Sequence, residues 1–317
     1  MTKNFKFLLE EARELGLSLD ILYPEKEVVE IRNSSRKIVV KEVFSFPNDP
    51  FSASAVLARN KEITYHFWKR ENIPFPHSCY FKSLAEFPLE SDSLNLRFPV
   101  VFKKSNGKKS IGIRTNITSF PELAKIVAES DGSFIVQEMV FGKEYRLLIY
   151  KERLLGALEL APPQIIGNGI DTITTLIKHK NTHLQKKILL NEKVLQTLGK
   201  NGLSFDSIPG KSVLVLLQEN SCLAEGGSSI DCTDIVHEKM LRLAIQAARA
   251  VNMRLAGIDV ICENIAADPD TQKVSFLETN SFPSLSIHYD PTVGKPRRVI
   301  KDILEDIFFQ LPKNIVL

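Results

Sequence analysis

The chain has few cysteines, four among 317 residues, and no two of them form a CxxC pair. A secreted domain held by disulfides normally has a denser cysteine framework, so this usage favours a reducing compartment. The first apolar residues are followed directly by acidic ones, which does not resemble a signal peptide. No uncharged apolar run reaches the length of a membrane span. We therefore expect a cytoplasmic protein that makes no use of a membrane.

A strong excess of one charge sign is also absent. The 41 lysines and arginines nearly balance the 38 aspartates and glutamates, which leaves a net charge of only +3. Nucleic-acid binding normally needs concentrated positive charge, so we expect no nucleic-acid partner. The hydrophobic content of 44% is ordinary for a globular protein. The length allows two domains or three small ones, and we place the first boundary near residue 60.

Several familiar catalytic patterns are missing as well. The sequence has no GxxxxGK[ST] loop, and no credible Ser/His/Asp or Cys/His set. His179 and His183 are four residues apart, but no glutamate stands between them as in HExxH, and lysines surround them. A solvated polar helix face explains this pair better than a metal site. Cys222 and Cys232 bracket a glycine-rich loop, yet a metal or redox role is not favoured there.

Two short apolar runs near the end of the chain do finish in polar side chains that could act together. One run contains Asp259, and the other leads to Glu278 and Asn280. The turn signal Asp268-Pro-Asp270 lies between them, so we expect a β-hairpin that sets the three polar residues side by side. Carboxylate and amide oxygens suit Mg²⁺, although a hairpin with ordinary surface acids fits the same pattern.

A basic, glycine-bounded loop provides a second candidate feature. The expected strand 98–103 ends in Lys103 and leads into a loop that contains Gly107, Lys109, Ser110 and Gly112. Backbone N–H groups in such a loop, together with lysine, could bind a polyphosphate. A basic hairpin tip on a solvated surface would look similar.

Periodicity predicts the remaining elements. We expect helices over 4–15, 53–68, 121–130, 184–198, 235–253 and 299–309. Asp171 is expected to cap a further helix. Strands are expected over 17–22, 27–32, 37–44, 134–140, 147–150, 154–160 and 211–217.

The order of these motifs resembles the ATP-grasp superfamily, and most closely the ATP-grasp modules of cyanophycin synthetases and of bifunctional glutathione synthetases. The resemblance covers roughly residues 50–310. It rests on the phrases Asn60-Lys-Glu-Ile-Thr64, Ile73-Pro-Phe-Pro76, Gly142-Lys-Glu-Tyr-Arg146, Ile166-Gly-Asn-Gly169, Gly226-Gly-Ser-Ser-Ile-Asp231, Ala256-Gly-Ile-Asp259, Glu278-Thr-Asn280 and Pro291-Thr-Val-Gly294-Lys-Pro-Arg297.

The resemblance implies an α+β fold in which two α+β subdomains grip ATP between antiparallel sheets, after a small α/β N-terminal domain. We expect that N-terminal domain over 1–60, a small subdomain with the phosphate loop over 61–138, and a C-terminal subdomain with the metal site over 139–317.

The resemblance also implies roles for single residues. Lys61 and Lys103 would hold phosphates, the loop from Gly107 to Gly112 with Lys109 and Ser110 would cover them, Gln137 and Val140 would bind adenine through the backbone, and Glu144 would bind ribose. Asp259, Glu278 and Asn280 would be the metal ligands. Lys103, Arg146 and Arg297 would be catalytic, with Arg146, His288 and Arg297 near the acyl acceptor.

The implied reaction is ATP-dependent amide or peptide bond formation through an acyl phosphate, with release of ADP and phosphate. The cofactors would be ATP and two Mg²⁺ ions, with Mn²⁺ as an alternative metal. The substrates would be amino acids or short peptides, and we expect a homo-oligomer, a dimer. Phosphoryl transfer to an acceptor other than a carboxylate is a further possibility.

Three positions depart from the family pattern. Leu160 and Gln218 replace arginines, and Cys222 replaces an asparagine, for which Asn220 could substitute if the loop shifts. Neither Leu nor Gln can replace the bidentate fork of arginine. The departures indicate either a different acid substrate or an ATP-grasp-like protein that binds nucleotide with reduced or no ligase turnover.

Overall fold

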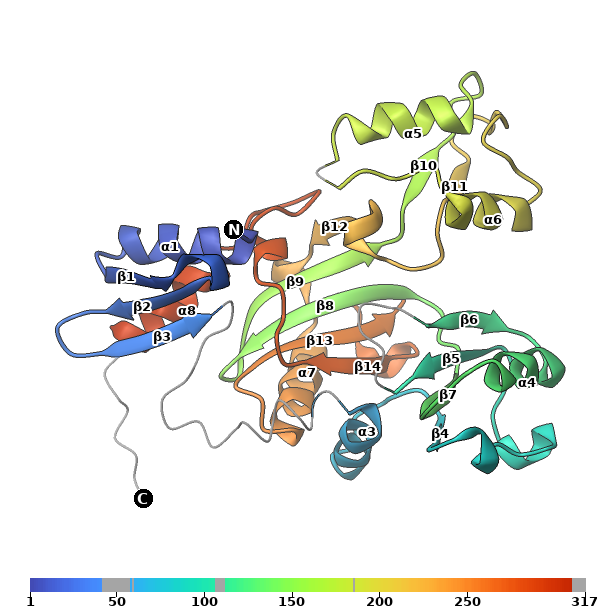
Figure 1. Ribbon diagram of the computed structural model, residues 1–317, viewed down its shortest axis with the longest axis horizontal. Coiled ribbons are helices and arrows are strands. Elements are labelled where there is room, and N and C mark those ends of the chain that lie inside the picture. Colours follow the sequence, from blue (N-terminus) through green and yellow to red (C-terminus); the bar gives the residue numbers. More distant parts are fainter. Residues whose placement is uncertain (42–57, 59, 106–111, 185, 310–317) are drawn as a thin grey trace.

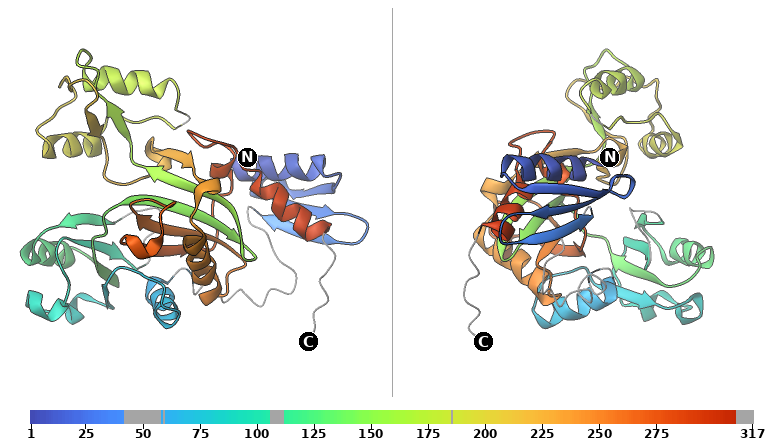
Figure 2. Two further views of the ribbon diagram at one scale, coloured as in Figure 1. Left: turned by 180° about the vertical axis from the view of Figure 1, so that it is seen from behind. Right: turned by 60° about the vertical axis from the view of Figure 1, so that its left-hand side comes forward.

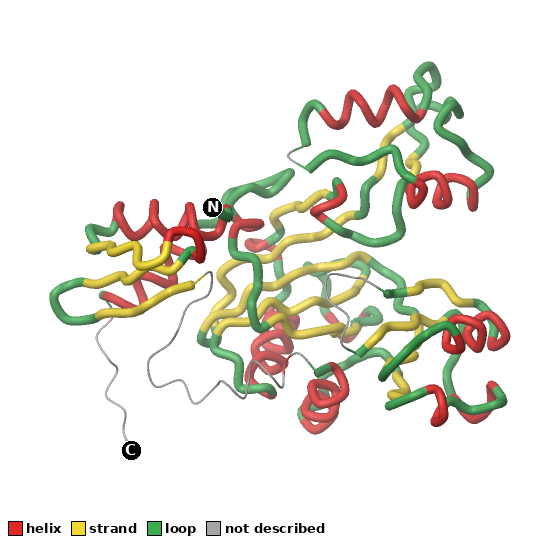
Figure 3. Tube along the Cα trace, viewed as in Figure 1, coloured by secondary structure: helices red, strands yellow, loops and turns green. Residues whose placement is uncertain are grey.

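The computed structural model describes residues 1–41, 58, 60–105, 112–184 and 186–309. These residues form four antiparallel sheets, of three, two, five and four strands. The five-stranded sheet lies at the centre of the molecule, and the other three units surround it (Figure 1). Figure 3 shows the same arrangement coloured by helix and strand.

The N-terminal unit combines elements from the beginning of the chain with a helix from near its end. Helix α1 begins after Thr2, whose Oγ1 accepts a hydrogen bond from the N–H of Phe5 at 3.3 Å. The apolar sides of α1, the three-stranded sheet and α8 enclose one core, and Figure 2 shows α8 beside that sheet. The elements of the unit are α1 (Lys3–Glu14), β1 (Ser18–Tyr23), β2 (Val28–Arg32), β3 (Lys37–Lys41) and α8 (Val299–Phe308).

The small sheet unit has strand order β4-β7-β5-β6. Its core is rich in phenylalanine, and Phe134 stacks on Phe81 with ring centroids 5.1 Å apart. Sequence periodicity did not predict β4 or β6, which have four residues each. The elements are β4 (Ser78–Phe81), β5 (Val100–Lys104), β6 (Arg114–Ile117), α4 (Phe120–Ala128) and β7 (Phe134–Glu138).

The central sheet has strand order β12-β9-β8-β13-β14. Helices α3 and α7 cover one of its faces, where Trp68 of α3 donates a hydrogen bond to the carbonyl of Ala247 at 3.0 Å. Its elements are β8 (Lys143–Tyr150), β9 (Arg153–Ala161), β12 (Ser228–Asp231), β13 (Leu255–Cys262), β14 (Ser275–Asn280), α3 (Lys61–Arg70) and α7 (Glu238–Ala250).

The helix expected over 53–68 is interrupted at Asn60. Asn60 caps α3, because its Oδ1 accepts a hydrogen bond from the N–H of Ile63 at 3.2 Å. Ala58 is helical, and residues 53–57 and 59 of the expected helix lie outside the described residues. The cap places Lys61 at the first position of the helix, beside the central sheet.

The ribbon lobe, residues 162–220, projects from the central sheet (Figure 1). Strands β10 (Gln164–Ile166) and β11 (Leu214–Leu216) form a two-stranded sheet that packs on α5 (Ile173–Asn181) and α6 (Glu192–Lys200) around a separate apolar core.

Two predictions in this lobe were wrong. Thr172, not Asp171, caps α5, and Asp171 instead accepts a hydrogen bond from Asn168. The helix expected over 184–198 begins only at Glu192, because Asn181 hydrogen-bonds the N–H and the carbonyl of Ile188 and holds that segment outside a helix.

Candidate active site

One face of the central sheet is polar at the centre of strands β8, β13 and β14. Side chains alternate between the two faces of a strand, so Glu144 and Arg146 of β8 point away from the helices that cover the other face. The strand register places Arg146 opposite Asp259 of β13, and Asp259 opposite Glu278 of β14. The predicted hairpin is therefore present, with its two carboxylates as direct neighbours.

Arg146 and Asp259 form a buried bidentate ion pair. Arg146 Nε lies 2.6 Å from Asp259 Oδ1, and Nη2 lies 2.7 Å from Oδ2. Asn280 Nδ2 donates a third hydrogen bond to Asp259 Oδ2 at 3.1 Å. Asp259 is only 3% exposed, so burial raises the pKa of its carboxyl, while the Arg146 guanidinium opposes this. An ion pair so little exposed is screened weakly by solvent.

Lys61 forms an ion pair with Glu278 of β14, the neighbour of β13 in the sheet. The ammonium of Lys61, from the first turn of α3, donates a hydrogen bond to Glu278 Oε2. Burial alone would raise the pKa of Glu278, but the charge and hydrogen bond of Lys61 lower that pKa to about 2. The carboxylate therefore stays ionised at neutral pH, in contact with a cation from another element.

Lys103 reaches the same cluster from β5 of the small sheet unit. Burial and the nearby charge of Lys61 lower the pKa of Lys103 to about 8, although Glu278 and Glu144 act in the opposite direction. Burial also raises the pKa of Glu144, and the hydrogen bond from Ser221 opposes that change. Two lysines, one arginine and three carboxylates thus meet where the small sheet unit approaches the central sheet.

Other predicted residues lie apart from this cluster. Arg297 pairs with Asp231 and Asp234, with Nη2 at 2.6 Å and 2.8 Å from their carboxylates. Gln137 is buried in β7, and its Oε1 has no hydrogen-bond partner among the described residues. Val140 follows that strand and is half-buried.

The predicted phosphate loop is only partly described. Gly112 has φ +79°, the left-handed conformation that favours glycine. Three further predicted loop residues, Gly107, Lys109 and Ser110, lie outside the described residues.

His288 is the other residue expected near the acyl acceptor. It is 1% exposed and packs against Gly156, where an added Cβ would stand 2.6 Å from His288 Nδ1. The charge of Arg146 is close enough to lower the pKa of His288, which burial lowers first, to about 3. His288 is therefore a neutral side chain that packs near Arg146.

Three positions depart from the family pattern. Leu160 lies on β9, and Gln218 and Cys222 lie between β11 and β12. Leu160 is buried and pairs with Glu144 across β9 and β8. Gln218 is 3% exposed, and its Oε1 and the Oδ1 of Asn220 have no hydrogen-bond partner in the described part of the chain. Cys222 is half-buried and accepts backbone hydrogen bonds from Glu225 and Gly227 through its carbonyl.

Two contacts made by residues at the end of the ribbon lobe and just beyond it, Glu219 and Ser221, were not foreseen. Ser221 donates its hydrogen bond to Glu144. Thr115, at the start of β6, donates to Glu219 Oε2 at 2.7 Å, and Lys200 donates to Glu219 Oε1 at 2.6 Å. No local pattern marks these polar residues, because each contact joins segments far apart in the sequence.

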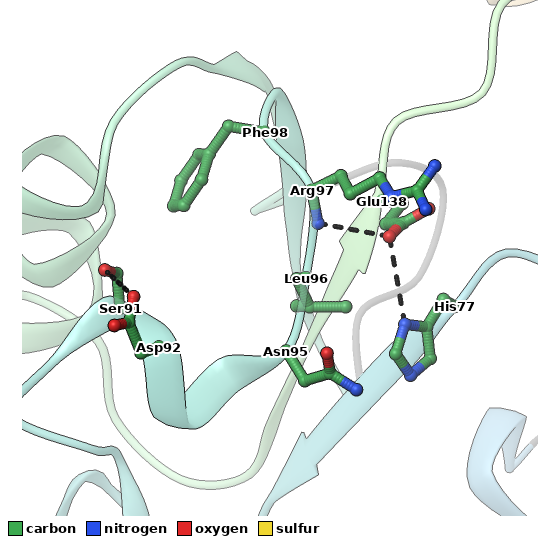
Figure 4. Close-up of a pocket in the computed structure, with 8 residues that line it drawn as sticks. All are labelled: His77, Ser91, Asp92, Asn95, Leu96, Arg97, Phe98 and Glu138. Carbon is green, nitrogen blue, oxygen red and sulfur yellow. Dashed lines mark hydrogen bonds and ion pairs between the residues drawn. The ribbon is translucent and has the colours of Figure 1, made fainter.

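A surface cavity of about 760 Å³ lies on the small sheet unit. Figure 4 shows that Glu138 accepts a hydrogen bond from the N–H of Arg97, at 3.1 Å, and lies 3.8 Å from His77 Nδ1. None of the residues that line this cavity belongs to the charged cluster. The candidate active site is therefore defined by the cluster rather than by this cavity.

The class of fold follows from this arrangement: an antiparallel central sheet whose polar face meets a second antiparallel sheet is the ATP-grasp fold, and the predicted fold class is confirmed. A solved bifunctional glutathione synthetase from Pasteurella multocida matches with a TM-score of 0.73 and 26% identity, over 96% of this chain and 44% of that one.

Known sequences point to the same group of proteins. The bifunctional glutathione biosynthesis protein GshAB of Clostridium perfringens is 28% identical over 322 residues, which cover 96% of this chain and 40% of that protein. The GshAB of Pasteurella multocida is 27% identical, over 98% of this chain and 43% of the relative. The chain thus spans less than half the length of these relatives, and it resembles a glutathione synthetase-like ATP-grasp module. No protein-family model matches it.

None of the helices in the described residues is long and apolar enough to cross a membrane.

Proposed function

We propose that the chain is an ATP- and Mg²⁺-dependent carboxylate–amine ligase. The observation that supports this most directly is the convergence of Lys61, Lys103, Glu144, Asp259 and Glu278, which come from helix α3 and from strands of two sheets. Phosphoryl transfer needs cations and hard oxygen ligands placed around a polyphosphate, and needs no nucleophilic side chain. The cluster has these groups.

The nucleotide would lie between the small sheet unit and the central sheet. In this proposal Lys61 and Lys103 bind the phosphates, and the loop from Gly107 to Gly112 covers them. The backbone of Gln137 and Val140 binds the adenine, and Glu144 binds the ribose. The buried Oε1 of Gln137, which lacks a partner among the described residues, fits a site completed by a ligand.

Asp259, Glu278 and Asn280 would hold the metal. Two carboxylates and an amide oxygen fit Mg²⁺, which retains phosphate and water ligands in such sites. Within the described ranges no group of three or more His, Cys, Asp and Glu side chains is arranged for a metal. We propose two Mg²⁺ ions, with Mn²⁺ as the alternative metal. These ions would neutralise charge on the phosphates.

The reaction would join two small molecules, which we propose to be amino acids or short peptides. The γ-phosphoryl group passes to the carboxylate of the first, and ADP leaves. The amine of the second then attacks the acyl carbon and displaces phosphate, so one amide bond forms for each ATP used. Lys103 would neutralise the transferring group, and Arg146 would orient the carboxylate ligand Asp259.

A coupled ADP assay tests this function across amino acids and short peptides. We expect ADP release only when an acid and an amine are both present, and a product mass equal to their sum less one water. Glu278→Ala should lower turnover at least about a hundredfold, whereas Glu263→Ala, at an exposed position beyond β13, should leave it unchanged. Absence of ADP release across the panel would contradict the ligase.

A second candidate is a nucleotide-binding protein with reduced or no turnover. Leu160 and Gln218, both buried at positions where the resemblance implies arginine, favour it. ATP would then raise the melting temperature of the chain while the ATP concentration stays constant. Full turnover with any acid and amine would exclude this candidate.

We also propose a cytoplasmic, homo-oligomeric protein. The four cysteines are free thiols, which fits a reducing compartment.

A further inference from the structure

The segment that follows β14 lies against the polar face of the central sheet. It runs over residues 281–298, from the proposed metal ligand Asn280 to α8, and we call it the return segment. A Cβ added to Gly257 of β13 would stand 3.0 Å from Pro283 Cβ and 3.9 Å from Arg146 Cδ. The start of the return segment therefore packs beside Arg146, on the face that carries the charged cluster.

His288 shows where the return segment lies along the strands. Glu144, Arg146 and Leu148 follow one another on one face of β8, because every second side chain of a strand shares a face. Gly156 of β9 pairs with Leu148, and His288 packs on Gly156. His288 therefore lies beyond Arg146 when β8 is followed away from Glu144. Leu148 itself belongs to the core of the N-terminal unit, so that unit lies next to the site on the same face.

This end of the site is where the amine would lie. In the proposed function, the nucleotide runs from the ribose ligand Glu144 towards the metal ligand Asp259, which is the register partner of Arg146. The carboxylate that receives the γ-phosphoryl group must lie next to the phosphates, and the amine attacks its carbon from beyond it. The amine is therefore expected past Arg146, against the return segment.

One face of α1 contacts the return segment. Asn4 and Phe7 are three residues apart in the helix, so they share this face. Asn4 Oδ1 accepts a hydrogen bond from the N–H of Ser286 at 2.7 Å. The ring of Phe7 stacks on that of Tyr289, with centroids 4.2 Å apart. The contacts of α1 therefore lie on both sides of His288 in the sequence.

Glu11 is buried on the same face, one turn further along α1. It is 3% exposed, and its Oε1 accepts hydrogen bonds from the hydroxyl of Tyr289 at 3.0 Å and from Arg298 Nε at 2.9 Å. Tyr289 follows His288, and Arg298 follows Arg297. The N–H of Arg297 also donates to the carbonyl of His288 at 2.7 Å. One carboxylate thus holds both ends of the loop between these residues.

We propose that Glu11 is a positioning residue for the amine end of the site. Through Tyr289 and Arg298 it fixes the backbone of the neighbouring His288 and Arg297, and so the shape of the return segment against the central sheet. Hydrogen bonds to an ionised group are stronger than neutral ones, and a buried pair is weakly screened. The proposal rests on the ligase function proposed above, and it gives the N-terminal unit a part in substrate binding.

Steady-state kinetics of Tyr289→Phe test this role, because the variant retains the ring that stacks on Phe7 and loses only the hydroxyl. The assay uses the acid and amine that give the fastest ADP release by the wild type. We expect the KM for the amine to rise about tenfold, while the KM for ATP and kcat stay nearly unchanged. Glu11→Gln, which retains the size of the side chain and loses its charge, should raise the KM for the amine at least as much.

Glu14→Gln is the matched control. Glu14 also pairs with Arg298, with Oε1 2.9 Å from Nη1, but its side chain is 54% exposed. An exposed pair contributes little, so all three kinetic constants should remain those of the wild type. The double variant of Glu11→Gln and Tyr289→Phe should raise the KM for the amine by less than the product of the single effects, because both remove one shared hydrogen bond.

Hydrogen exchange in the return segment measures its position without any substrate. Exchange should be faster than in the wild type in Glu11→Gln and Tyr289→Phe, and unchanged in Glu14→Gln. Thermal unfolding shows that each variant is folded at the assay temperature.

The positioning role would be overturned by a folded Tyr289→Phe or Glu11→Gln variant that keeps the KM of the wild type for the amine. Equal rises in the KM for ATP and for the amine would overturn it too, because they would indicate a purely structural role. A wild type that releases no ADP would contradict the ligase function itself and the positioning role with it. An active wild type with unaffected variants would contradict the positioning role alone.

Discussion

The floor of the candidate site and the ribbon lobe that reaches it hold their polar groups in different ways. On the floor, which we define as Arg146, Asp259 and Glu278, two carboxylates meet a cation of another element: the buried Asp259 meets Arg146, and the half-buried Glu278 meets Lys61. In the lobe, the contacts are single and exposed, as between Thr115 and Glu219. Desolvated charge pairs are costly to disrupt, and exposed ones are not. The floor should therefore govern stability and chemistry, and the lobe should adjust affinity.

Asp259→Asn should have the largest effect on stability and turnover. The substitution leaves the guanidinium of Arg146 without its anionic partner in a mostly buried position. We expect a loss of about 3 kcal/mol in the free energy of unfolding and a loss of turnover of at least about a hundredfold. Urea unfolding of the nucleotide-free protein measures the first, and the ADP assay measures the second.

The control for this substitution is Glu238→Gln. It removes one partner of the exposed pair between Glu238 and Arg242 on α7. No measurable change in either quantity is expected there. If the two variants have equal free energies of unfolding, the ion pair between Arg146 and Asp259 contributes no more to stability than the exposed pair does.

The pH dependence of ADP binding should distinguish the contribution of Lys103 from the contributions of Lys61 and Arg146. Because burial lowers the pKa of Lys103 to about 8, its ammonium loses the proton as the pH rises through that value. The affinity for ADP should then fall about tenfold by about pH 9, at one proton per bound nucleotide. Calorimetry at several pH values measures this slope.

Lys103→Arg is the matched variant, since a guanidinium stays charged over this range. Its affinity for ADP should remain constant between neutral pH and about pH 9. If the variant keeps the slope of the wild type, another group is responsible for it.

Glu219→Ala should have the smallest effect. It removes the hydrogen bond from Thr115, which joins the strand after the predicted phosphate loop to the ribbon lobe. We expect the KM for ATP to rise about threefold with little change in kcat, as befits an exposed contact. Glu192→Ala, whose hydrogen bond to Gln196 stays within α6, should change neither constant. A large fall in kcat would show that the ribbon lobe contributes to catalysis. The proposed difference between the lobe and the floor would then be wrong.

Much of this fold can be read from the sequence where the apolar period is strong. The β13–β14 hairpin and helices α1, α7 and α8 follow their patterns to within a few residues. Residues 186–190 show why other segments cannot be read in this way. Their composition favours a helix, but the two hydrogen bonds between Asn181 and Ile188 override the local preference.

The site was predictable in its residue types but not in its pairings. Asp259 and Glu278 are neighbours because one hairpin joins them, and the turn between them is visible in the sequence. The partner of Arg146 depends on the register of β8 against β13, between segments more than a hundred residues apart. No local signal specifies that register, so the sequence did not predict the ion pair between Arg146 and Asp259.

The packing of α8 against α1 has a consequence for the synthesis of the chain. Helix α1 is synthesised before α8 and completes its core only when Val299–Phe308 follows, and Arg298 then pairs with Glu11 and Glu14. Domains usually fold in the order in which they are made. Here α1 must wait for the later α8, so a chain halted before α8 would expose the apolar side of α1.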